Sequence, residues 1–210
     1  MRSYDQYCGL ARALDHVGHR WTLLVVRELL LGPKRFSDLR DALPGIASNL
    51  LTDRLRHLEA DGLVARRELP PPAARTVYEL TPAGRDLEEA VHALVRWGGR
   101  WMLRGPEGDT FRAPWLALAL DALGVGDRLA GVVLDLVTAD ERVRLTSRDG
   151  RVVALAPDDA PADATLTAEP ATILGLAAGA VEPAQARRSI EAEPSGEDAE
   201  RLVLRVLRAE

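Results

Sequence analysis

Residues 18–81 contain a succession of apolar patterns that constrains the fold of this chain more than any other segment. The order is an apolar helix, a short second helix, a tight Pro44-Gly45 turn, a third helix, and two short strands joined by a proline-rich tip. This order is typical of a winged helix-turn-helix, which places one helix in a DNA groove and lays the strand loop along the phosphates. The segment therefore predicts double-stranded DNA as a partner.

Apolar spacing and helix-breaking residues set the expected element boundaries in this half of the chain. We expect helices over residues 8–17, 22–31, 36–43 and 48–60, strands over 63–68 and 76–80, and a long helix from Pro82 to about Leu103. Thr81 is the expected N-cap of that long helix, with proline at its first position. Ser37 and Ser48 are the expected caps of the third and fourth helices.

The helix predicted over residues 48–60 has one polar face. Leu51, Leu55 and Leu58 share the opposite, apolar face, so the polar face is available for base edges. We expect bases to be read by Ser48, Asn49, Thr52 and Arg56. The arginines expected to hold phosphates are Arg35, Arg40, Arg54, Arg66, Arg67 and Arg75.

Charge is divided unevenly along the chain. Residues 1–104 contain 16 Lys and Arg against 13 Asp and Glu, whereas the remainder contains 11 against 19. The division coincides with the end of the DNA-binding pattern, which favours a basic binding module joined to an acidic one, although ordinary surface charge is the alternative. We therefore predict a DNA-binding and dimerisation domain over 1–104, a Gly- and Pro-containing linker over 105–114, and a second domain over 115–210.

The second domain is predicted to be a small α+β unit, with a curved sheet covered by helices, so the whole chain belongs to the α+β class. Expected helices cover residues 115–123, 170–178 and 197–208, and expected strands cover 132–138, 142–146, 152–155, 164–167 and, at an edge, 189–193. Asp149-Gly150 is the sequence of a two-residue hairpin turn.

Several short motifs in the first half occur together. They are Gly18-His19-Arg20-Trp21-Thr22, Arg27-Glu28-Leu29, Arg35-Phe36, Leu43-Pro44-Gly45-Ile46, Arg54-Leu55, Leu58-Glu59-Ala60-Asp61-Gly62-Leu63-Val64, Tyr78-Glu79-Leu80-Thr81-Pro82-Ala83-Gly84 and Trp97-Gly98. With them the chain resembles, over about residues 7–102, the HxlR family of winged-helix regulators, which is related to MarR. The resemblance implies a homodimeric transcription factor joined through its first and last helices. The residues assigned to that contact are Leu10, Leu14, Leu94, Trp97 and Trp101; for the tryptophans, packing within one monomer is the alternative.

Cys8 is the single cysteine, so no internal disulfide can form. The family often has Cys-Pro near its start, where this chain has Cys8-Gly9, and in some relatives that cysteine senses oxidants or electrophiles. Sensing requires an accessible thiolate of low pKa, and Arg12 follows one helical turn later. A redox role for Cys8 is therefore one hypothesis, and a small buried residue is the alternative.

The second half resembles the sterol-carrier-protein type-2 fold on residues 132–136, 143–145, 149–153 and 162–167, followed by 173–179. The resemblance implies an apolar tunnel that takes a small apolar ligand. The residues expected to line it are Val132, Leu134, Leu136, Leu145, Val153 and Leu166. Two alternatives are a dimerisation or docking module without a ligand, and an apolar-molecule carrier whose winged helix contacts protein.

The sequence contains no recognisable catalytic constellation. Its four histidines, His16, His19, His57 and His92, all lie in the first half, and no neighbouring cysteine or carboxylate pair completes a metal site. We therefore expect no enzyme activity, no cofactor and no metal. The N-terminus lacks the apolar stretch of a signal peptide and no run approaches the roughly 18 residues of a membrane span, so we expect a cytoplasmic protein without membrane contact.

Overall fold

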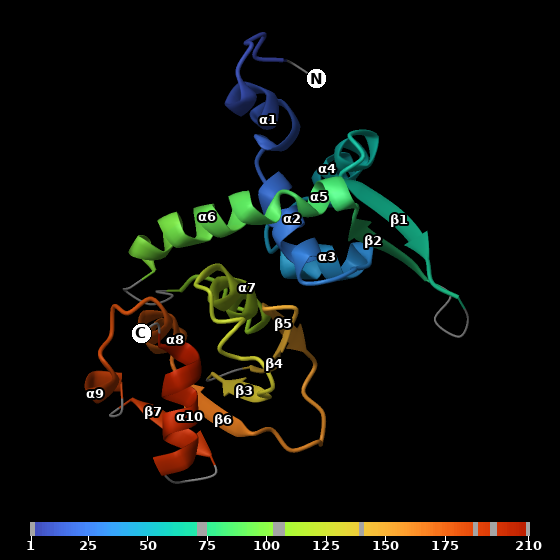
Figure 1. The fold of residues 1–210 in the computed structure, drawn as a ribbon. Coiled ribbons are helices and arrows are strands. Elements are labelled where there is room, and N and C mark those ends of the chain that lie inside the picture. Colours follow the sequence, from blue (N-terminus) through green and yellow to red (C-terminus); the bar gives the residue numbers. More distant parts are fainter. Residues whose placement is uncertain are drawn as a thin grey trace. The chain divides into compact units, whose positions relative to one another are not determined.

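The computed structural model describes residues 3–70, 75–102, 108–138, 141–186, 189–193 and 197–208. The chain divides into two compact units, Met1–Val91 and His92–Glu210. The division falls within helix α6 (Glu88–Gly98), so this helix begins in the first unit and ends in the second (Figure 1). No helix in the described ranges is both long and apolar enough to cross a membrane.

The first unit is the winged helix-turn-helix that the sequence predicts. It comprises α1 (Gly9–Val17), α2 (Thr22–Leu30), α3 (Phe36–Ala42), α4 (Ser48–Ala60), β1 (Val64–Glu68), β2 (Thr76–Leu80), α5 (Pro82–Arg85) and the start of α6. Strands β1 and β2 pair antiparallel as the wing, from Val64 opposite Leu80 to Glu68 opposite Thr76 (Figure 1). Residues 71–74 of the predicted proline-rich tip lie outside the described residues.

The core of this unit forms between α2, α3, α4 and the wing. Its buried apolar residues include Val25, Val26, Leu29, Leu39, Leu43, Leu51, Leu55, Leu58, Val64, Val77 and Leu80. Leu51, Leu55 and Leu58 of α4 are each at most 1% exposed. Burying each leucine contributes about 1.5–3 kcal/mol, so the apolar stripe of α4 fixes which side of that helix faces solvent.

The long helix predicted from Pro82 to about Leu103 is interrupted, which corrects the sequence expectation. Helix α5 ends at Arg85, and α6 begins only at Glu88. The interruption is a tight turn in which the Leu87 amide donates to the Gly84 carbonyl three residues earlier, at 3.3 Å. A short 3-10 helix over Gly99–Trp101 follows α6, and Leu103 lies outside the described residues.

The start of α5 agrees with the sequence prediction. The Gly84 amide donates to the Thr81 hydroxyl at 3.1 Å, and Pro82 occupies the first helical position. A Cβ atom at Gly84 would lie 2.0 Å from the Leu63 carbonyl oxygen, so only glycine allows α5 to approach the chain this closely.

The second unit consists of a mixed five-stranded sheet and four helices besides the end of α6, counted over the described residues. The elements are α7 (Pro114–Ala122), β3 (Leu134–Val137), β4 (Arg142–Arg148), β5 (Arg151–Leu155), β6 (Ala164–Ala168), α8 (Pro170–Ala177), α9 (Pro183–Ala186), β7 (Ile190–Glu193) and α10 (Glu197–Leu207). The strand order is β5-β4-β3-β6-β7, with β3 and β6 parallel and the other pairs antiparallel. Strand β7 lies at an edge as predicted, and α9 was not predicted.

The predicted Asp149-Gly150 hairpin turn joins β4 and β5. Both residues have positive φ, 53° and 75°, as a two-residue turn of this kind requires. Gly126 is a second position where glycine is required, because a Cβ atom there would lie 1.9 Å from the Gly150 carbonyl oxygen. The chain after α7 can therefore pass directly against the hairpin turn.

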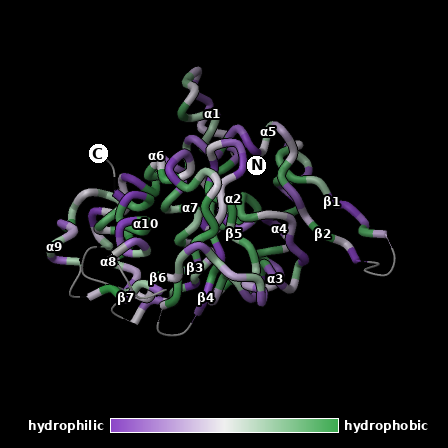
Figure 2. The backbone as a smooth tube through the Cα atoms, turned by 60° about the horizontal axis from the view of Figure 1, so that its bottom comes forward, coloured by the Kyte–Doolittle hydropathy of each residue, from purple (hydrophilic) through white to green (hydrophobic). Residues whose placement is uncertain are grey.

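One face of the sheet is apolar, and α7, α8 and α10 form the helical layer packed beside it (Figure 1). Leu134 lies opposite Leu145 and beside Ala164, and Leu136 lies beside Leu166. These four leucines are completely buried. The segments containing α7 and β3 accordingly include strongly hydrophobic stretches, whereas the outer ends of β1 and β2 in the first unit include hydrophilic ones (Figure 2).

Val153 does not lie on that apolar face, which corrects its predicted position. It pairs with Thr146, whereas Ala154 pairs with Leu145. Directly opposed residues in an antiparallel pair share a face, so Val153 points to the other side of the sheet from Leu145. Val132 precedes β3 and is not part of the sheet.

The opposite face of the sheet contains a buried ion pair between Asp135 and Arg144, which are 0% and 4% exposed. The Nε and Nη2 atoms of Arg144 each donate to the Asp135 carboxylate at 2.9 Å. Arg144 also pairs with Asp158 and donates to the Ala160 carbonyl at 2.7 Å, while Arg142 donates to Asp135 at 2.5 Å. Hydrogen bonds from Arg144 hold the pKa of Asp135 below its usual range.

Replacing Asp135 with asparagine should destabilise the second unit, because the buried Arg144 would lose its buried carboxylate partner and keep only the exposed Asp158. We expect the free energy of unfolding at neutral pH to fall by about 3–5 kcal/mol, measured by urea denaturation followed by circular dichroism. Because the pKa of Asp135 is lowered on folding, its contribution is present above the usual carboxyl pKa and is lost as the pH falls. The exposed Asp159→Asn is the control, expected to change stability by less than about 0.5 kcal/mol. Equal losses in the two variants would contradict a stabilising ion pair.

Candidate nucleic-acid interface

The exposed face of α4 carries the polar residues that the sequence assigns to base reading. Asn49, Thr52 and Arg56 are exposed, on the side of the helix away from its buried leucines. The Arg56 guanidinium is 3.3 Å from the Asp53 carboxylate, but their side chains are 72% and 51% exposed. An ion pair this exposed contributes about 0–1 kcal/mol, so DNA can replace it at little cost.

The N-terminus of α4 differs from its prediction, because Ser48 is the first helical residue and not the cap. Ala47 is the N-cap and offers no side-chain acceptor. The Leu50 amide donates to the Asn49 side-chain oxygen at 2.9 Å, so a side chain already serves one of the first amides of α4. In α3 the Asp38 carboxylate accepts from the Arg35 amide at 3.0 Å, so Asp38 caps this helix and Ser37 does not.

Arg54 does not share the exposed face of α4. It follows Leu51 by three residues and precedes Leu55, so its side chain is half-buried. Its Nε atom is buried and has no hydrogen-bond partner among the described residues. Its assigned phosphate contact therefore stays a prediction that the local geometry does not favour. Arg40 is exposed on α3, 3.4 Å from Asp41, and Arg35 is half-buried at the start of the same helix.

The wing places three exposed arginines near its outer end. Arg67 donates to Glu79 on the neighbouring strand at 2.9 Å, and the Arg66 guanidinium lies 5.7 Å from the ring centre of Tyr78 and 4.0 Å from Glu59. Arg75 has no carboxylate partner among the described residues. Figure 1 shows that the hairpin of β1 and β2 projects beyond the helices of this unit. A wing must project in this way if its loop is to lie along a phosphate backbone.

Lys34 is a basic residue of this region that the sequence analysis left out. Its amide donates to the Tyr78 carbonyl at 3.0 Å, and the Tyr78 amide donates to the Lys34 carbonyl at 2.7 Å. This isolated bridge ties the start of α3 to the wing. A pairing of one residue has no periodic signal, so the sequence could not show it.

The residues assigned to dimerisation are all exposed in the single chain. Their exposed fractions are 69% for Leu10, 38% for Leu14, 48% for Leu94, 57% for Trp97 and 61% for Trp101. The alternative that the tryptophans belong to the monomer core is therefore wrong. Cys8 is also exposed, which rules out the alternative that it is a small buried residue.

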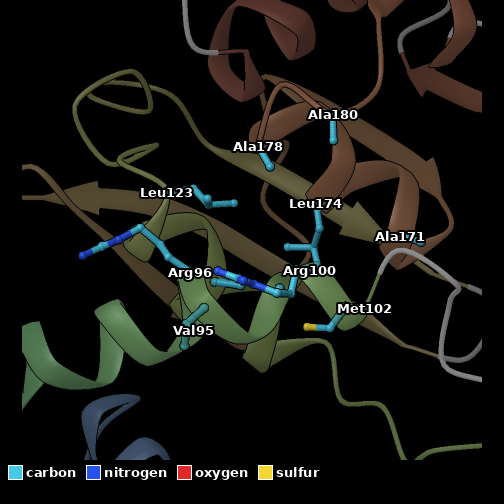
Figure 3. Close-up of a pocket in the computed structure, with 11 residues that line it drawn as sticks. Val95, Arg96, Arg100, Met102, Leu123, Ala171, Leu174, Ala178 and Ala180 are labelled. Carbon is cyan, nitrogen blue, oxygen red and sulfur yellow. The ribbon is translucent and has the colours of Figure 1, made fainter.

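The second unit contains a cavity of about 240 Å³ that the predicted pocket residues do not line. It is lined by Val95, Arg96, Gly99, Arg100, Met102, Ala119, Leu123, Ala171, Leu174, Ala178 and Ala180 (Figure 3). These residues come from the end of α6 and the chain just after it, from α7 and Leu123 beyond it, and from α8 and the turn that follows. Leu134, Leu136, Leu145 and Leu166 instead fill the core between the sheet and the helices.

The fold and the exposed polar helix define a winged-helix DNA-binding regulator, and comparison with known proteins gives its family. Residues 16–106 match the model of the HxlR-like helix-turn-helix family. A helix-turn-helix transcriptional regulator of Synechocystis is 37% identical over 45% of this chain and 70% of its own length. The regulator YvaP of Bacillus subtilis is 35% identical over 43% of this chain and 84% of its own length. The chain therefore belongs to the HxlR-like helix-turn-helix family of transcriptional regulators.

Two solved structures with some similarity cover the same half. The redox regulator HypR in its oxidized form is 35% identical, over 44% of this chain and 96% of its own, with a TM-score of 0.42. The reduced transcriptional regulator YodB from B. subtilis is 30% identical, over 48% of this chain and 99% of its own, with a TM-score of 0.41. The family match ends at residue 106, before most of the second unit.

Substitutions on α4 and on the wing should have different effects on DNA binding. Arg56→Ala should reduce the preference for a duplex selected from random sequences, since a lost base contact costs about 1–3 kcal/mol on that duplex alone. Arg67→Ala should weaken binding to selected and random duplexes equally and reduce the salt slope by less than about one unit, because Glu79 already pairs with Arg67. Fluorescence anisotropy at several salt concentrations measures the sequence preference and the salt slope. Arg148→Ala, on the second unit, is the control and should change neither. Equal losses on both duplexes for Arg56→Ala would contradict its base-reading role.

Proposed function

We propose that this regulator acts as a homodimer and that its affinity for DNA changes when a small apolar ligand binds the second unit. The observation that carries this proposal is the apolar cavity at the end of α6. The same helix begins in the DNA-binding unit, so it belongs both to the ligand cavity and to the winged-helix domain.

A ligand shifts the DNA-binding equilibrium only if its affinity differs between the DNA-bound and free states. The cavity is suited to this requirement because three separate helical segments contribute to its lining. A displacement of α6 relative to α7 or α8 would change the cavity and therefore the ligand affinity. Any such displacement would also act on the residues of α6 that belong to the first unit.

Exposed apolar side chains support the homodimer. Leu94 and Trp97 are exposed near the end of α6, with Trp101 just beyond, and the rings of the two tryptophans lie 4.7 Å apart in an edge-to-face arrangement. Leu10 and Leu14 are exposed on α1. Large exposed apolar residues gathered on one element are typical of a surface that another chain covers.

The likeness of the second unit to a sterol carrier stays a prediction, and the ligand proposal does not depend on it. The predicted tunnel residues Leu134, Leu136, Leu145 and Leu166 are completely buried in the core, so the proposal relies on the cavity among the helices instead. A structural dimerisation module without a ligand is the competing function for this unit.

Native mass spectrometry of freshly purified protein tests the homodimer and the ligand together. We expect a dimer that carries additional mass, and we expect that mass to dissociate under denaturing conditions. Leu174→Trp should fill the cavity and remove the additional mass while leaving the dimer intact. A monomer would contradict the dimer, and additional mass retained by Leu174→Trp would contradict this cavity as the ligand site.

A second candidate function is a redox response through Cys8, favoured by the position of its thiol. Cys8 is the N-cap residue of α1, and the backbone amides of Ala11 and then Leu10 lower the pKa of the thiol. A thiolate that is exposed and stabilised in this way reacts more readily at neutral pH. Arg12 does not contribute as the sequence suggested, since its guanidinium is 3.4 Å from Asp15 and 3.2 Å from the Ser3 hydroxyl.

Alkylation of Cys8 by iodoacetamide tests this role without interference, because the chain has no other cysteine. The rate should rise with pH through a midpoint that is lower in the folded protein than in the same protein in urea. The reason is that the amides at the start of α1 stabilise the thiolate only when the helix is formed. Coincident midpoints would contradict an activated thiol.

A further inference from the structure

The cavity in the second unit combines an apolar interior with two positive charges. Val95, Met102, Leu123 and Leu174 supply large apolar side chains, and alanines from α7, α8 and the turn after α8 supply most of the rest. Among the described lining residues, Arg96 and Arg100 are the charged ones, and the lining contains no acidic side chain. Figure 3 shows both arginine side chains beside Val95, Leu123 and Leu174.

Arg96 is held in place by an uncharged partner. Its Nη1 atom donates to the carbonyl oxygen of Ala122 at 2.8 Å, and Ala122 is the last residue of α7. This carbonyl is one of those that a helix end leaves without a partner, so the bond anchors the guanidinium. A neutral acceptor does not cancel the positive charge, and the remaining N–H donors of Arg96 stay available.

Arg100 is likewise positioned without a carboxylate. Its Nε atom donates to the Trp97 carbonyl at 2.9 Å, and its guanidinium lies 5.3 Å from the Trp101 ring centre and 5.7 Å from that of Trp97. Stacking on aromatic rings orients a guanidinium and leaves its outer N–H groups exposed. Within the described parts of the chain, neither arginine forms an ion pair.

The second unit, residues 92–210, has an excess of acidic residues, 19 against 14 basic ones that include Arg96 and Arg100. Arg96 and Arg100, which lie one helical turn apart in the chain and have no carboxylate partner among the described residues, therefore stand out in a unit whose overall charge repels anions. Guanidinium groups bind carboxylates through paired, charge-assisted hydrogen bonds. Charge complementarity therefore favours an anionic group on the ligand at this end of the cavity.

We infer that this cavity binds a small organic monocarboxylate, with its apolar body inside and its carboxylate on Arg96 and Arg100. The volume of about 240 Å³ exceeds the roughly 150 Å³ of a cavity that holds benzene, so a bicyclic ring or a chain of several methylene groups fits. This inference deepens the proposed ligand response by naming the chemical class of the ligand. Ligand binding is measured without DNA. The experiment therefore tests the inferred ligand class independently of the proposal that the ligand changes the affinity for DNA.

Isothermal titration calorimetry of the full chain with octanoate, and with the neutral octanamide as the matched ligand, tests the inference. We expect octanoate to bind one site per chain at least tenfold more tightly than octanamide. Changing Arg96 and Arg100 together to glutamine should lower the octanoate affinity at least tenfold and leave octanamide binding unchanged. Arg148→Gln removes an exposed arginine of the same unit away from the cavity and should leave both affinities unchanged.

Cavity-filling variants test the location of the site. Leu174→Trp should abolish octanoate binding. If that variant fails to fold, Ala178→Trp, at an exposed position on the rim of the cavity, should abolish octanoate binding instead. Sedimentation velocity on each variant checks that the oligomeric state is unchanged, because Arg100 packs on Trp97 and Trp101.

Three outcomes would overturn the inference. The first is equal affinity for octanoate and octanamide, or no detectable binding of either. The second is octanoate binding that survives in the tryptophan variants. The third is an octanoate affinity that falls as the dimer fraction rises, because a second copy of the chain would then cover the cavity.

Discussion

The DNA-binding unit depends on the packing of α4 through Leu51, Leu55 and Leu58. These three side chains are essentially inaccessible to solvent, and they set the rotation of the helix about its own axis. A different rotation would bury Asn49 or Arg56 and expose a leucine, at a cost of several kcal/mol. The polar face of α4 is therefore presented to solvent because the opposite face is fixed in the core.

Close backbone packing also fixes how α5 and the wing meet the end of α4. The Leu63 backbone, which follows α4, meets Gly84 so closely that no side chain fits between them. Thr81 hydrogen-bonds at the same place, since its hydroxyl is 2.6 Å from the Gly62 carbonyl and accepts from Gly84. The wing and the start of α5 are thereby joined to the end of α4.

The sequence predicts those parts of the structure that have a local physical cause. The leucine spacing of α4, the Thr81-Pro82 helix start and the Asp149-Gly150 turn each depend on neighbouring residues, and each has the predicted form. The face of Val153 depends on the register of β5 against β4, and the prediction was wrong for it. The prediction also missed the local turn that separates α5 from α6. A single slip in register reverses the face of every residue on a strand, so alternation alone did not determine the face of Val153.

The cavity could not be predicted for a related reason. Its lining comes from three helical segments far apart in the chain, and many of its residues are alanines or glycines with no pattern of their own. The residues assigned to dimerisation are exposed as that assignment requires, and Trp97 belongs to the Trp97-Gly98 motif on which the family resemblance was based. Functional sites that depend on tertiary packing therefore require the structure, whereas the recognition helix was visible in the sequence.

The glutamates beside the wing arginines have a consequence for how this regulator searches DNA. The Glu79 carboxylate lies beside Arg67, and the Glu59 carboxylate lies beside Arg66. Each carboxylate is an anion of the protein where a DNA phosphate would otherwise bind. A phosphate that bound Arg66 or Arg67 would have to displace a carboxylate of the protein itself, so fewer counterions would be released than a count of positive charges suggests. This competition weakens contacts with arbitrary sequences as much as with the correct one. The protein should therefore dissociate from incorrect sites sooner, and the base contacts made by α4 should account for a larger share of its residence time at the correct site.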